Sequence, residues 1–184
     1  MARVLVPLAK GFEEIEAVTV IDILRRAGID VFCAGLEAGP VTGSHGLPIV
    51  PDGTLAEVLD QDFDMMVLPG GLPGADYLEN DPRVAAMLRR LADSGRFTAA
   101  ICAAPKVLAA AGLLDGRTAT SYPGFLDPGR TPGLELSEAP VVEDGPVITS
   151  RGPGTAMDFA LALVERLEGK DASNTVEERL QRPR

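Results

Sequence analysis

Short apolar runs alternate with longer stretches of helical spacing along the chain, and the first 36 residues show this most clearly. Arg3–Leu8 is an apolar run ended by Lys10-Gly11, which is typical of a buried parallel strand. Glu13–Ala27 has apolar residues at helical spacing, acidic residues in its first turn and Gly28 as its stop. Asp30–Leu36 is a second apolar run. This segment therefore predicts a strand–helix–strand unit.

The alternation continues through the rest of the chain. Further strands are predicted at Met65–Leu68, Thr98–Ile101, Arg117–Ser121 and Pro146–Thr149. Helices are predicted at Asp81–Leu91, Ala103–Ala111, Pro153–Leu167 and Asp171–Leu180, and a hairpin at Val41–Val50. Such alternation predicts an α/β fold with a mostly parallel sheet covered by helices on both faces. We see no internal repeat or linker, so we expect a single domain over residues 1–184.

Composition narrows the classes of function. Hydrophobic residues make up 46% of the chain, enough for a sizeable core and too many for a disordered chain. The 27 acidic residues outnumber 17 basic ones, and we find no Lys/Arg cluster, which argues against nucleic acid or anionic membranes as partners. No apolar run approaches the roughly 20 residues that cross a bilayer. We therefore expect a cytoplasmic protein that does not act at a membrane.

Cofactor and metal motifs are missing from the sequence. Two cysteines and one histidine form neither a disulfide framework nor a zinc site of the usual spacing. The glycine-rich segment Pro69–Gly74 lacks the spacing of a dinucleotide-binding loop, and we find no P-loop. We therefore predict no cofactor and no metal.

Three segments with chemical potential follow predicted strands: Gly11–Glu16, Pro69–Gly74 and Cys102. In open α/β sheets, ligands bind at the carboxyl ends of the strands. Cys102 stands between a strand and a helix, where a sharp turn can present a nucleophile and a helix start favours thiolate. It can equally be a small buried residue, as free cysteines commonly are. Cys33, inside a predicted strand, is interpreted as structural.

The other candidates also have two interpretations each. Glu13, Glu14 and Glu16 either complement the helix dipole, or one of them hydrogen-bonds the thiol and moves a proton. The backbone N–H groups of Gly70 and Gly71 either face an oxyanion or belong to an ordinary tight turn.

Arg151 and His45 are the remaining polar candidates. Arg151 precedes a helix and either holds an anion or belongs to a plain capping loop. His45 is predicted to be an exposed hairpin residue far from the strand ends. It would reach Cys102 only by folding over the site or by coming from another subunit.

The motifs taken together resemble the ThiJ/PfpI superfamily, and within it the DJ-one branch. The segments that carry the resemblance are Leu8–Glu16, Leu68–Gly71, Ala99–Pro105 and Thr149–Thr155. The resemblance implies a flavodoxin-like three-layer sandwich and a homodimer. It also implies an oxidation-sensitive Cys102 hydrogen-bonded to Glu16, with the N–H groups of Gly71 and Ala103 forming an anion-stabilising pocket.

Two departures from the pattern of the superfamily restrict the chemistry. Tyr122 stands where many members of the branch have a histidine near the cysteine, and Ala103 stands where peptidase-like members have one. Peptidase and glutaminase activities are therefore disfavoured. Any catalysis must depend mainly on Cys102 and Glu16, with Tyr122, Arg151 and His45 as candidates for binding a substrate or anion.

The leading hypothesis is a cysteine-dependent enzyme of the glyoxalase III or deglycase type, acting on methylglyoxal or its adducts. The alternative is a non-catalytic sensor of oxidative stress, or a redox-regulated chaperone, that uses oxidation of Cys102. By resemblance, the homodimer forms around the first helix and the Val41–Val50 hairpin, which would place His45 near the partner's site.

Overall fold

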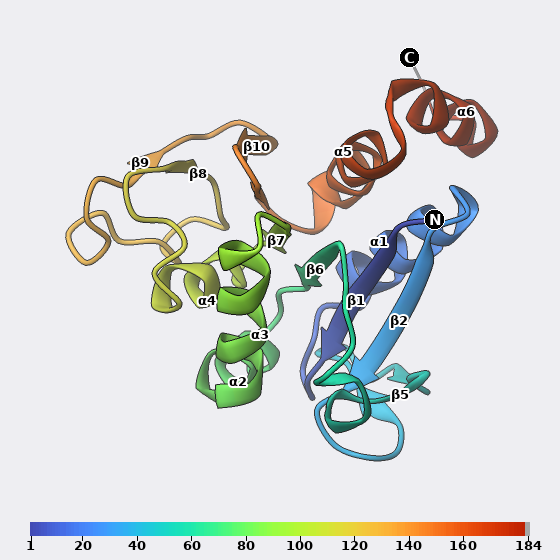
Figure 1. Cartoon of the computed structure of the whole chain (residues 1–184), viewed down its shortest axis with the longest axis horizontal. Helices are drawn as coiled ribbons and strands as arrows, with labels where there is room; N and C mark the ends of the chain where they lie inside the picture. Colours follow the sequence, from blue (N-terminus) through green and yellow to red (C-terminus); the bar gives the residue numbers. More distant parts are fainter. Residues whose placement is uncertain (183–184) are drawn as a thin grey trace.

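One seven-stranded sheet forms the middle layer of the computed structural model, which describes residues 1–182 (Figure 1). The strand order is β10-β11-β7-β6-β1-β2-β5. Adjacent strands are parallel except for β10, which runs antiparallel to β11. The strands are β1 (Arg3–Leu8), β2 (Asp30–Gly35), β5 (Gly53–Thr54), β6 (Met65–Leu68), β7 (Phe97–Ile101), β10 (Val141–Asp144) and β11 (Val147–Ser150). The predicted α/β fold with a mostly parallel sheet is confirmed.

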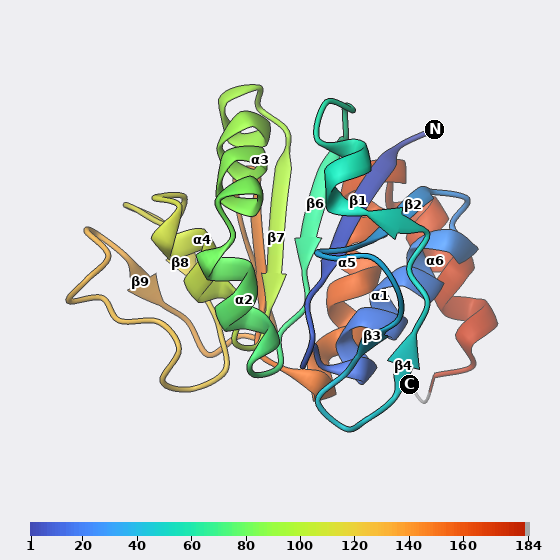
Figure 2. The same cartoon turned by 90° about the horizontal axis from the view of Figure 1, so that it is seen from below.

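Helices cover both faces of this sheet (Figures 1 and 2). One face carries α1 (Glu14–Arg26), α5 (Ala156–Glu168) and α6 (Lys170–Leu180). The other face carries α2 (Gly74–Asn80), α3 (Pro82–Asp93) and α4 (Pro105–Ala110). Short 3₁₀ turns lie at Leu55–Val58 and Pro153–Thr155. This is the three-layer arrangement that the resemblance implied.

The central strands are almost entirely apolar, as expected of strands covered on both faces. In β1, the residues Val4, Leu5, Val6 and Leu8 are fully buried. Val4 and Val6 pack in the core beneath α1 and α5, whereas Leu5 packs in the core beneath α2 and α3. Alternate side chains of a strand point to opposite faces, so one apolar run supplies both cores.

Two small sheets lie outside the main one. Strands β3 (Val41–Thr42) and β4 (Pro48–Ile49) pair antiparallel and form the predicted hairpin. Strands β8 (Thr118–Ala119) and β9 (Glu135–Leu136) pair parallel. The prediction of a further strand at Arg117–Ser121 is therefore wrong in extent, and the two paired residues bond to β9 rather than to the main sheet. Pattern alone does not distinguish a short outlying pair from a sheet strand.

Three elements differ from the prediction: β10, α2 and the start of α4. Strand β10 was not predicted, although Gly145, at φ 60°, supplies the left-handed turn that joins it to β11. Helix α2 fills the segment before Asp81, where we predicted no element. Helix α4 begins at Pro105 instead of Ala103, because Cys102–Ala104 form a turn.

The topology brings three connecting segments to one place. Because β1, β6 and β7 are neighbours, the residues that follow them meet at the carboxyl edge of the sheet, where ligands of such folds bind.

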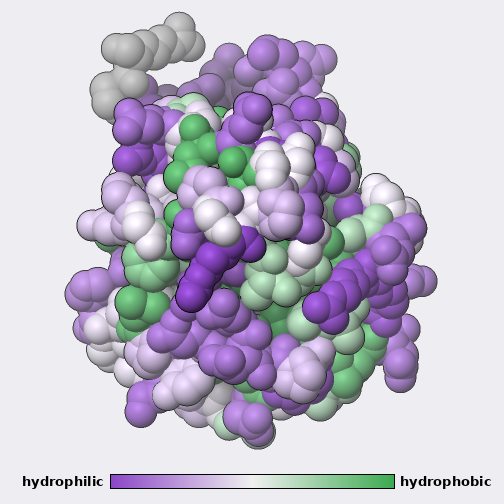
Figure 3. Space-filling view, turned by 90° about the vertical axis from the view of Figure 1, so that its left-hand side faces the viewer, coloured by the Kyte–Doolittle hydropathy of each residue, from purple (hydrophilic) through white to green (hydrophobic). Residues whose placement is uncertain are grey.

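Over residues 1–182, no helix combines the length and the apolar character that spanning a membrane requires. Polar residues dominate the face shown in Figure 3, with apolar residues scattered among them.

Candidate active site

Cys102 occupies a sharp turn directly after β7. Its φ of 65° lies in the left-handed region, which a side chain other than glycine enters at a cost of about 1–2 kcal/mol. The Cys102 N–H donates to Ser150 O at 3.0 Å, and Cys102 O accepts from the N–H of Tyr122 at 2.9 Å. Neighbouring segments thus hold the strained backbone, and Cys102 as a residue is 9% exposed. Strain of this kind clusters at functional sites.

Glu16 approaches Cys102 from the first turn of α1. The residue is fully buried, and its Oε2 accepts a 2.8 Å hydrogen bond from the N–H of Gly70. Its other oxygen, Oε1, forms no hydrogen bond among residues 1–182, while the carboxyl group as a whole is hydrogen-bonded to the Cys102 thiol. A buried carboxylate normally finds donors for both oxygens, so this arrangement suits a protonated carboxyl group.

Gly70 is the residue that lets the cysteine and the glutamate come together. A Cβ on Gly70 would lie 2.7 Å from both Cys102 Cβ and Glu16 Oε2. No side chain fits in that space without displacing one of these two groups. Only glycine at position 70 therefore leaves the space in which the two candidate catalytic side chains meet.

Burial dominates the electrostatics of the pair. It raises the pKa of Glu16 to about 7; the negative charge of Glu13 acts in the same direction, while Cys102 and the Gly70 N–H oppose it. Burial, followed by the charge and hydrogen bonding of Glu16, raises the pKa of Cys102 to about 12. The N–H groups of Ala103 and Gly71 donate to the sulfur and lower this pKa in part. These N–H groups favour the thiolate, as expected at this position, but burial and Glu16 outweigh them, so a thiolate is disfavoured while Glu16 is ionised.

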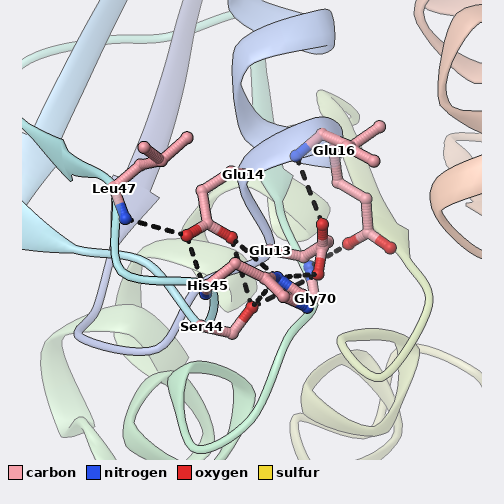
Figure 4. Close-up of polar contacts among 8 residues, drawn as sticks. Glu13, Glu14, Glu16, Ser44, His45, Leu47 and Gly70 are labelled. Atoms are coloured by element: carbon pink, nitrogen blue, oxygen red, sulfur yellow. Dashed lines mark hydrogen bonds and ion pairs between the residues drawn. The ribbon is translucent and has the colours of Figure 1, made fainter.

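Glu13 and Glu14 hold the hairpin against the start of α1 (Figure 4). Glu13 caps the helix by accepting from the N–H of Ile15, and it also accepts from Ser44 Oγ at 3.2 Å. Glu14 Oε1 accepts from His45 N at 2.8 Å and from the N–H of Leu47 at 3.3 Å. Burial raises the pKa of Glu14, but the hydrogen bonds from the hairpin and from the backbone N–H of Glu14 itself outweigh burial and lower this pKa to about 2. Both carboxylates thus have structural partners.

His45 lies at this junction, and its predicted distance from the strand ends is wrong. Its Nδ1 is 3.2 Å from Glu14 Oε2 and 3.4 Å from Glu13 Oε2, because the hairpin folds back onto α1 (Figure 4). The side chain is 73% exposed, as predicted. Ligand atoms of Glu13, Glu14 and His45 lie within 4.8 Å of one another. Hydrogen-bond donors of the hairpin already bind these carboxylates, so we interpret the cluster as a structural contact that joins the hairpin to α1.

Tyr122, Arg151 and Cys33 have different surroundings. The Tyr122 backbone is bonded to Cys102, and its half-exposed ring stacks edge-on against Phe125 with centroids 6.1 Å apart. The Arg151 guanidinium donates to Glu138 O at 3.1 Å. Cys33 is buried, and burial raises its pKa to about 12. The structure therefore brings Tyr122 to the Cys102 segment and gives Arg151 a separate backbone partner.

Ser150 is a positioning residue that the sequence analysis did not single out. Its carbonyl holds the Cys102 N–H, and its hydroxyl donates to Pro140 O at 2.6 Å. Thr155 Oγ1 lies 2.7 Å from the same hydroxyl. Only the neighbouring position of β11 and β7 in the sheet reveals this support, so no local sequence signal could have found it.

The fold and the buried cysteine–glutamate pair define an α/β protein with a strand-to-helix cysteine site. Comparison with known proteins shows the family: residues 2–166 match the model of the DJ-1/PfpI family, and the chain belongs to it. It is 46% identical to protein dj-1beta of Drosophila melanogaster over 168 residues, covering 91% of this chain and 90% of that protein. It is 39% identical to the glutathione-independent glyoxalase DJR-1.2 of Caenorhabditis elegans over 175 residues, covering 95% and 92% of the two chains.

Some relatives are much longer than this chain, which spans less than half of their length. The chain is 42% identical to protein DJ-1 homolog A of Arabidopsis thaliana over 175 residues, which are 94% of this chain and 45% of that protein. Among solved structures, Drosophila melanogaster DJ-1beta has a TM-score of 0.92 at 42% identity, with 100% and 99% of the chains covered. Oxidized Toxoplasma gondii DJ-1 has a TM-score of 0.91 at 37% identity, with 98% of each covered.

Proposed function

We propose that this protein is an enzyme that converts small α-oxoaldehydes such as methylglyoxal, with Cys102 as nucleophile and Glu16 as proton carrier. The observation that carries the proposal is the Glu16 carboxyl group, buried beside the thiol with one unpartnered oxygen and a pKa raised to about 7. A group with this pKa can both take and give a proton at neutral pH. The relative named as a glutathione-independent glyoxalase supports the same reaction class.

The proposed reaction needs only the substrate, water and these residues. The Cys102 sulfur adds to the aldehyde carbon, and the former carbonyl oxygen takes the thiol proton to give a hemithioacetal. Glu16 removes the proton from the carbon attached to sulfur, and the neighbouring ketone oxygen takes up a proton to give an enediol. Glu16 then returns its proton to the neighbouring carbon, and the hydroxyl group on the carbon attached to sulfur loses its proton to become the carbonyl of a lactate thioester. Water then cleaves the carbon–sulfur bond, giving lactic acid and the free thiol. The atoms balance as methylglyoxal plus water to lactic acid.

The N–H groups of Gly71 and Ala103 are suited to stabilise the oxygen during addition. Both donate to the sulfur in the resting structure, so they lie within reach of an oxygen that forms on the adjoining carbon. A deglycase reaction would use the same sulfur against the same kind of carbon, when that carbon carries an amine or thiol adduct. The two activities therefore differ in the leaving group.

A second candidate function is sensing of peroxide through Cys102. The specific observation is that the Glu16 carboxyl group and two N–H groups surround the sulfur; once protonated, Glu16 would join them in donating to the oxygens of a sulfinate. A sensor of this kind would respond to peroxide without turning over aldehyde.

The test is steady-state lactate formation from methylglyoxal by the wild type and by Cys102→Ser, with Cys33→Ser as the matched cysteine control. The proposal predicts turnover by the wild type and Cys33→Ser and none above background by Cys102→Ser. Equal lactate formation by all three proteins would reject Cys102 as the nucleophile. Selective oxidation of Cys102 without lactate formation would favour the sensor.

We also propose that two copies pair through α1 and the β3–β4 hairpin. Ile15, Val18, Leu47 and Val50 are apolar residues of these segments and are 48% to 80% exposed. Apolar side chains gathered on one surface favour coverage by a partner. Sedimentation equilibrium should give twice the 19.3 kDa chain mass, and Val50→Glu should shift the protein towards monomer. A wild-type monomer at micromolar concentration would contradict this assembly.

A further inference from the structure

A cavity of about 760 Å³ opens at the carboxyl edge of the sheet, apart from Cys102. It is lined by the end of β1, the β2–β3 connection and the junction of α2 and α3, namely Leu8–Lys10, Leu36–Thr42, Tyr77 and Asn80–Arg83. Cys102 is not among the residues that line it. The volume is typical of small-molecule sites, which measure roughly 300–1,000 Å³.

The walls of this cavity are held in place by one ion-paired arginine. Arg83 Nη2 donates to Asp81 Oδ2 at 2.6 Å and to Leu36 O at 3.1 Å. Asp81 also accepts from the Arg83 N–H at 2.9 Å and thereby caps α3. The hydrogen bonds from Arg83 lower the pKa of Asp81, so the pair stays ionised at neutral pH. The β2–β3 connection and the α2–α3 junction are therefore tied together before any ligand arrives.

The charges around the cavity leave one cation without a protein partner. Arg83 neutralises Asp81 and also lies 3.7 Å from the exposed Glu37. Lys10 is exposed at the rim and forms no ion pair or side-chain hydrogen bond within residues 1–182. One free ammonium group suits a single negative charge, whereas a dianion would meet the acidic Glu37 and Asp81.

The remaining lining is mostly apolar, with one half-exposed aromatic ring. Leu36 and Pro40 contribute accessible aliphatic surface, and the buried Leu8 and Val41 lie behind it. Tyr77 is 49% exposed, and its hydroxyl forms no hydrogen bond within the described chain. A ring of this kind offers both an apolar face and a free polar end to a ligand.

We propose that this cavity binds a small molecule with an apolar body and a single carboxylate, with the body against Tyr77 and the carboxylate at Lys10. The site is separate from Cys102, and the proposal does not depend on the aldehyde chemistry.

The probe is octanoate, with octylamine as a ligand of equal length and opposite charge. Tyr122→Phe leaves Tyr77 as the only tyrosine in a chain without tryptophan, so its emission reports directly on the cavity. We expect octanoate to change this emission saturably in the millimolar range or tighter. We expect octylamine to cause no saturable change. No saturable response to octanoate, or an equal response to octylamine, would overturn the proposal.

Matched variants in calorimetric titrations locate the site. Lys10→Gln should weaken octanoate binding about three- to fivefold, as expected for one exposed ion pair, while Lys170→Gln should have no effect. Tyr77→Ala should weaken it further, while Tyr122→Ala, which alters an equally exposed ring, should not.

Two further titrations serve as controls. One tests whether blocking the cavity abolishes binding without unfolding the protein, and the other tests whether octanoate binds at Cys102 instead. Ala38→Trp places a bulky group on an exposed wall and should abolish binding without lowering the melting temperature. Cys102→Ser should bind octanoate as the wild type does. Weakening by Tyr122→Ala or Cys102→Ser, with none by the Lys10 and Tyr77 variants, would place the ligand elsewhere and overturn the assignment.

Discussion

The N–H of Gly70 donates to Glu16 Oε2 at 2.8 Å, and a Cβ on Gly70 would lie 2.7 Å from the same oxygen. One backbone position thus fixes the carboxyl group and also leaves the space through which it meets Cys102. Glu16 Oε1 keeps no partner among residues 1–182, and it is the oxygen available for a proton.

Gly70→Ala should therefore disrupt the site more than the fold. The added methyl group must displace Cys102 or Glu16, and we expect a loss of at least about tenfold in lactate formation and about 1–3 kcal/mol of unfolding free energy. Gly154→Ala is the matched control, because a Cβ there meets nothing within 4 Å. Kinetics and urea unfolding of both variants give the comparison. Full activity of Gly70→Ala would mean that the close approach is not needed.

Alkylation of Cys102 should respond to the charge of Glu16. An ionised Glu16 raises the pKa of the thiol, so Glu16→Gln should react with iodoacetamide faster than the wild type above pH 7. Below about pH 7 the wild-type carboxyl group takes up its proton, and the two rates should converge. Peptide mass spectrometry across the pH range measures both cysteines, and the buried Cys33 should lag behind Cys102 in each protein. A slower reaction of Glu16→Gln at pH 8.5 would contradict this electrostatic coupling.

Glu16 should also make stability depend on pH. Its pKa is raised from 4.5 to about 7 on folding, so its contribution is present below pH 4.5 and is lost as the pH rises through 7. The shift corresponds to roughly 3 kcal/mol at high pH. Glu16→Gln remains neutral and should be more stable than the wild type at pH 8.5, with the difference vanishing at pH 4. Urea unfolding at the two pH values measures this, with the exposed Asp22→Asn as control. An unchanged difference at both pH values would refute it.

Glu14 should have the opposite dependence. Its pKa is lowered from 4.5 to about 2 on folding, so its contribution is present above pH 4.5 and is lost as the pH falls towards 2. Glu14→Gln should cost about 1–3 kcal/mol at pH 7, because hairpin N–H groups lose a charged acceptor. Thermal unfolding between pH 7 and pH 3 should show the two proteins converging in acid. Glu178→Gln, on an exposed position of α6, is the control and should match the wild type.

The sequence predicted the layers of the fold because strongly periodic segments such as Arg3–Leu8 and Glu13–Ala27 are local signals. It also predicted that Glu16, Gly70 and Cys102 lie near one another, since all three follow strands that end at one edge. Their catalytic roles remain predictions.

Three features depend on tertiary contacts and could not be predicted. His45 lies at the helix start because Glu14 binds the hairpin backbone. The pKa of Cys102 is raised because its surroundings are buried. The cavity beside Tyr77 is lined by segments distant in sequence, two of which Arg83 joins by its hydrogen bond to Leu36 O.

The central claim is that Glu16 moves a proton for Cys102, and the most direct measurement is kcat/KM for lactate formation from methylglyoxal by Glu16→Gln. The amide keeps the shape of the carboxyl group but cannot carry the proton, so we predict a loss of about 10²–10⁴-fold. Asp22→Asn, on the same helix, should keep wild-type activity. A loss of less than threefold for Glu16→Gln in a folded protein would contradict the account.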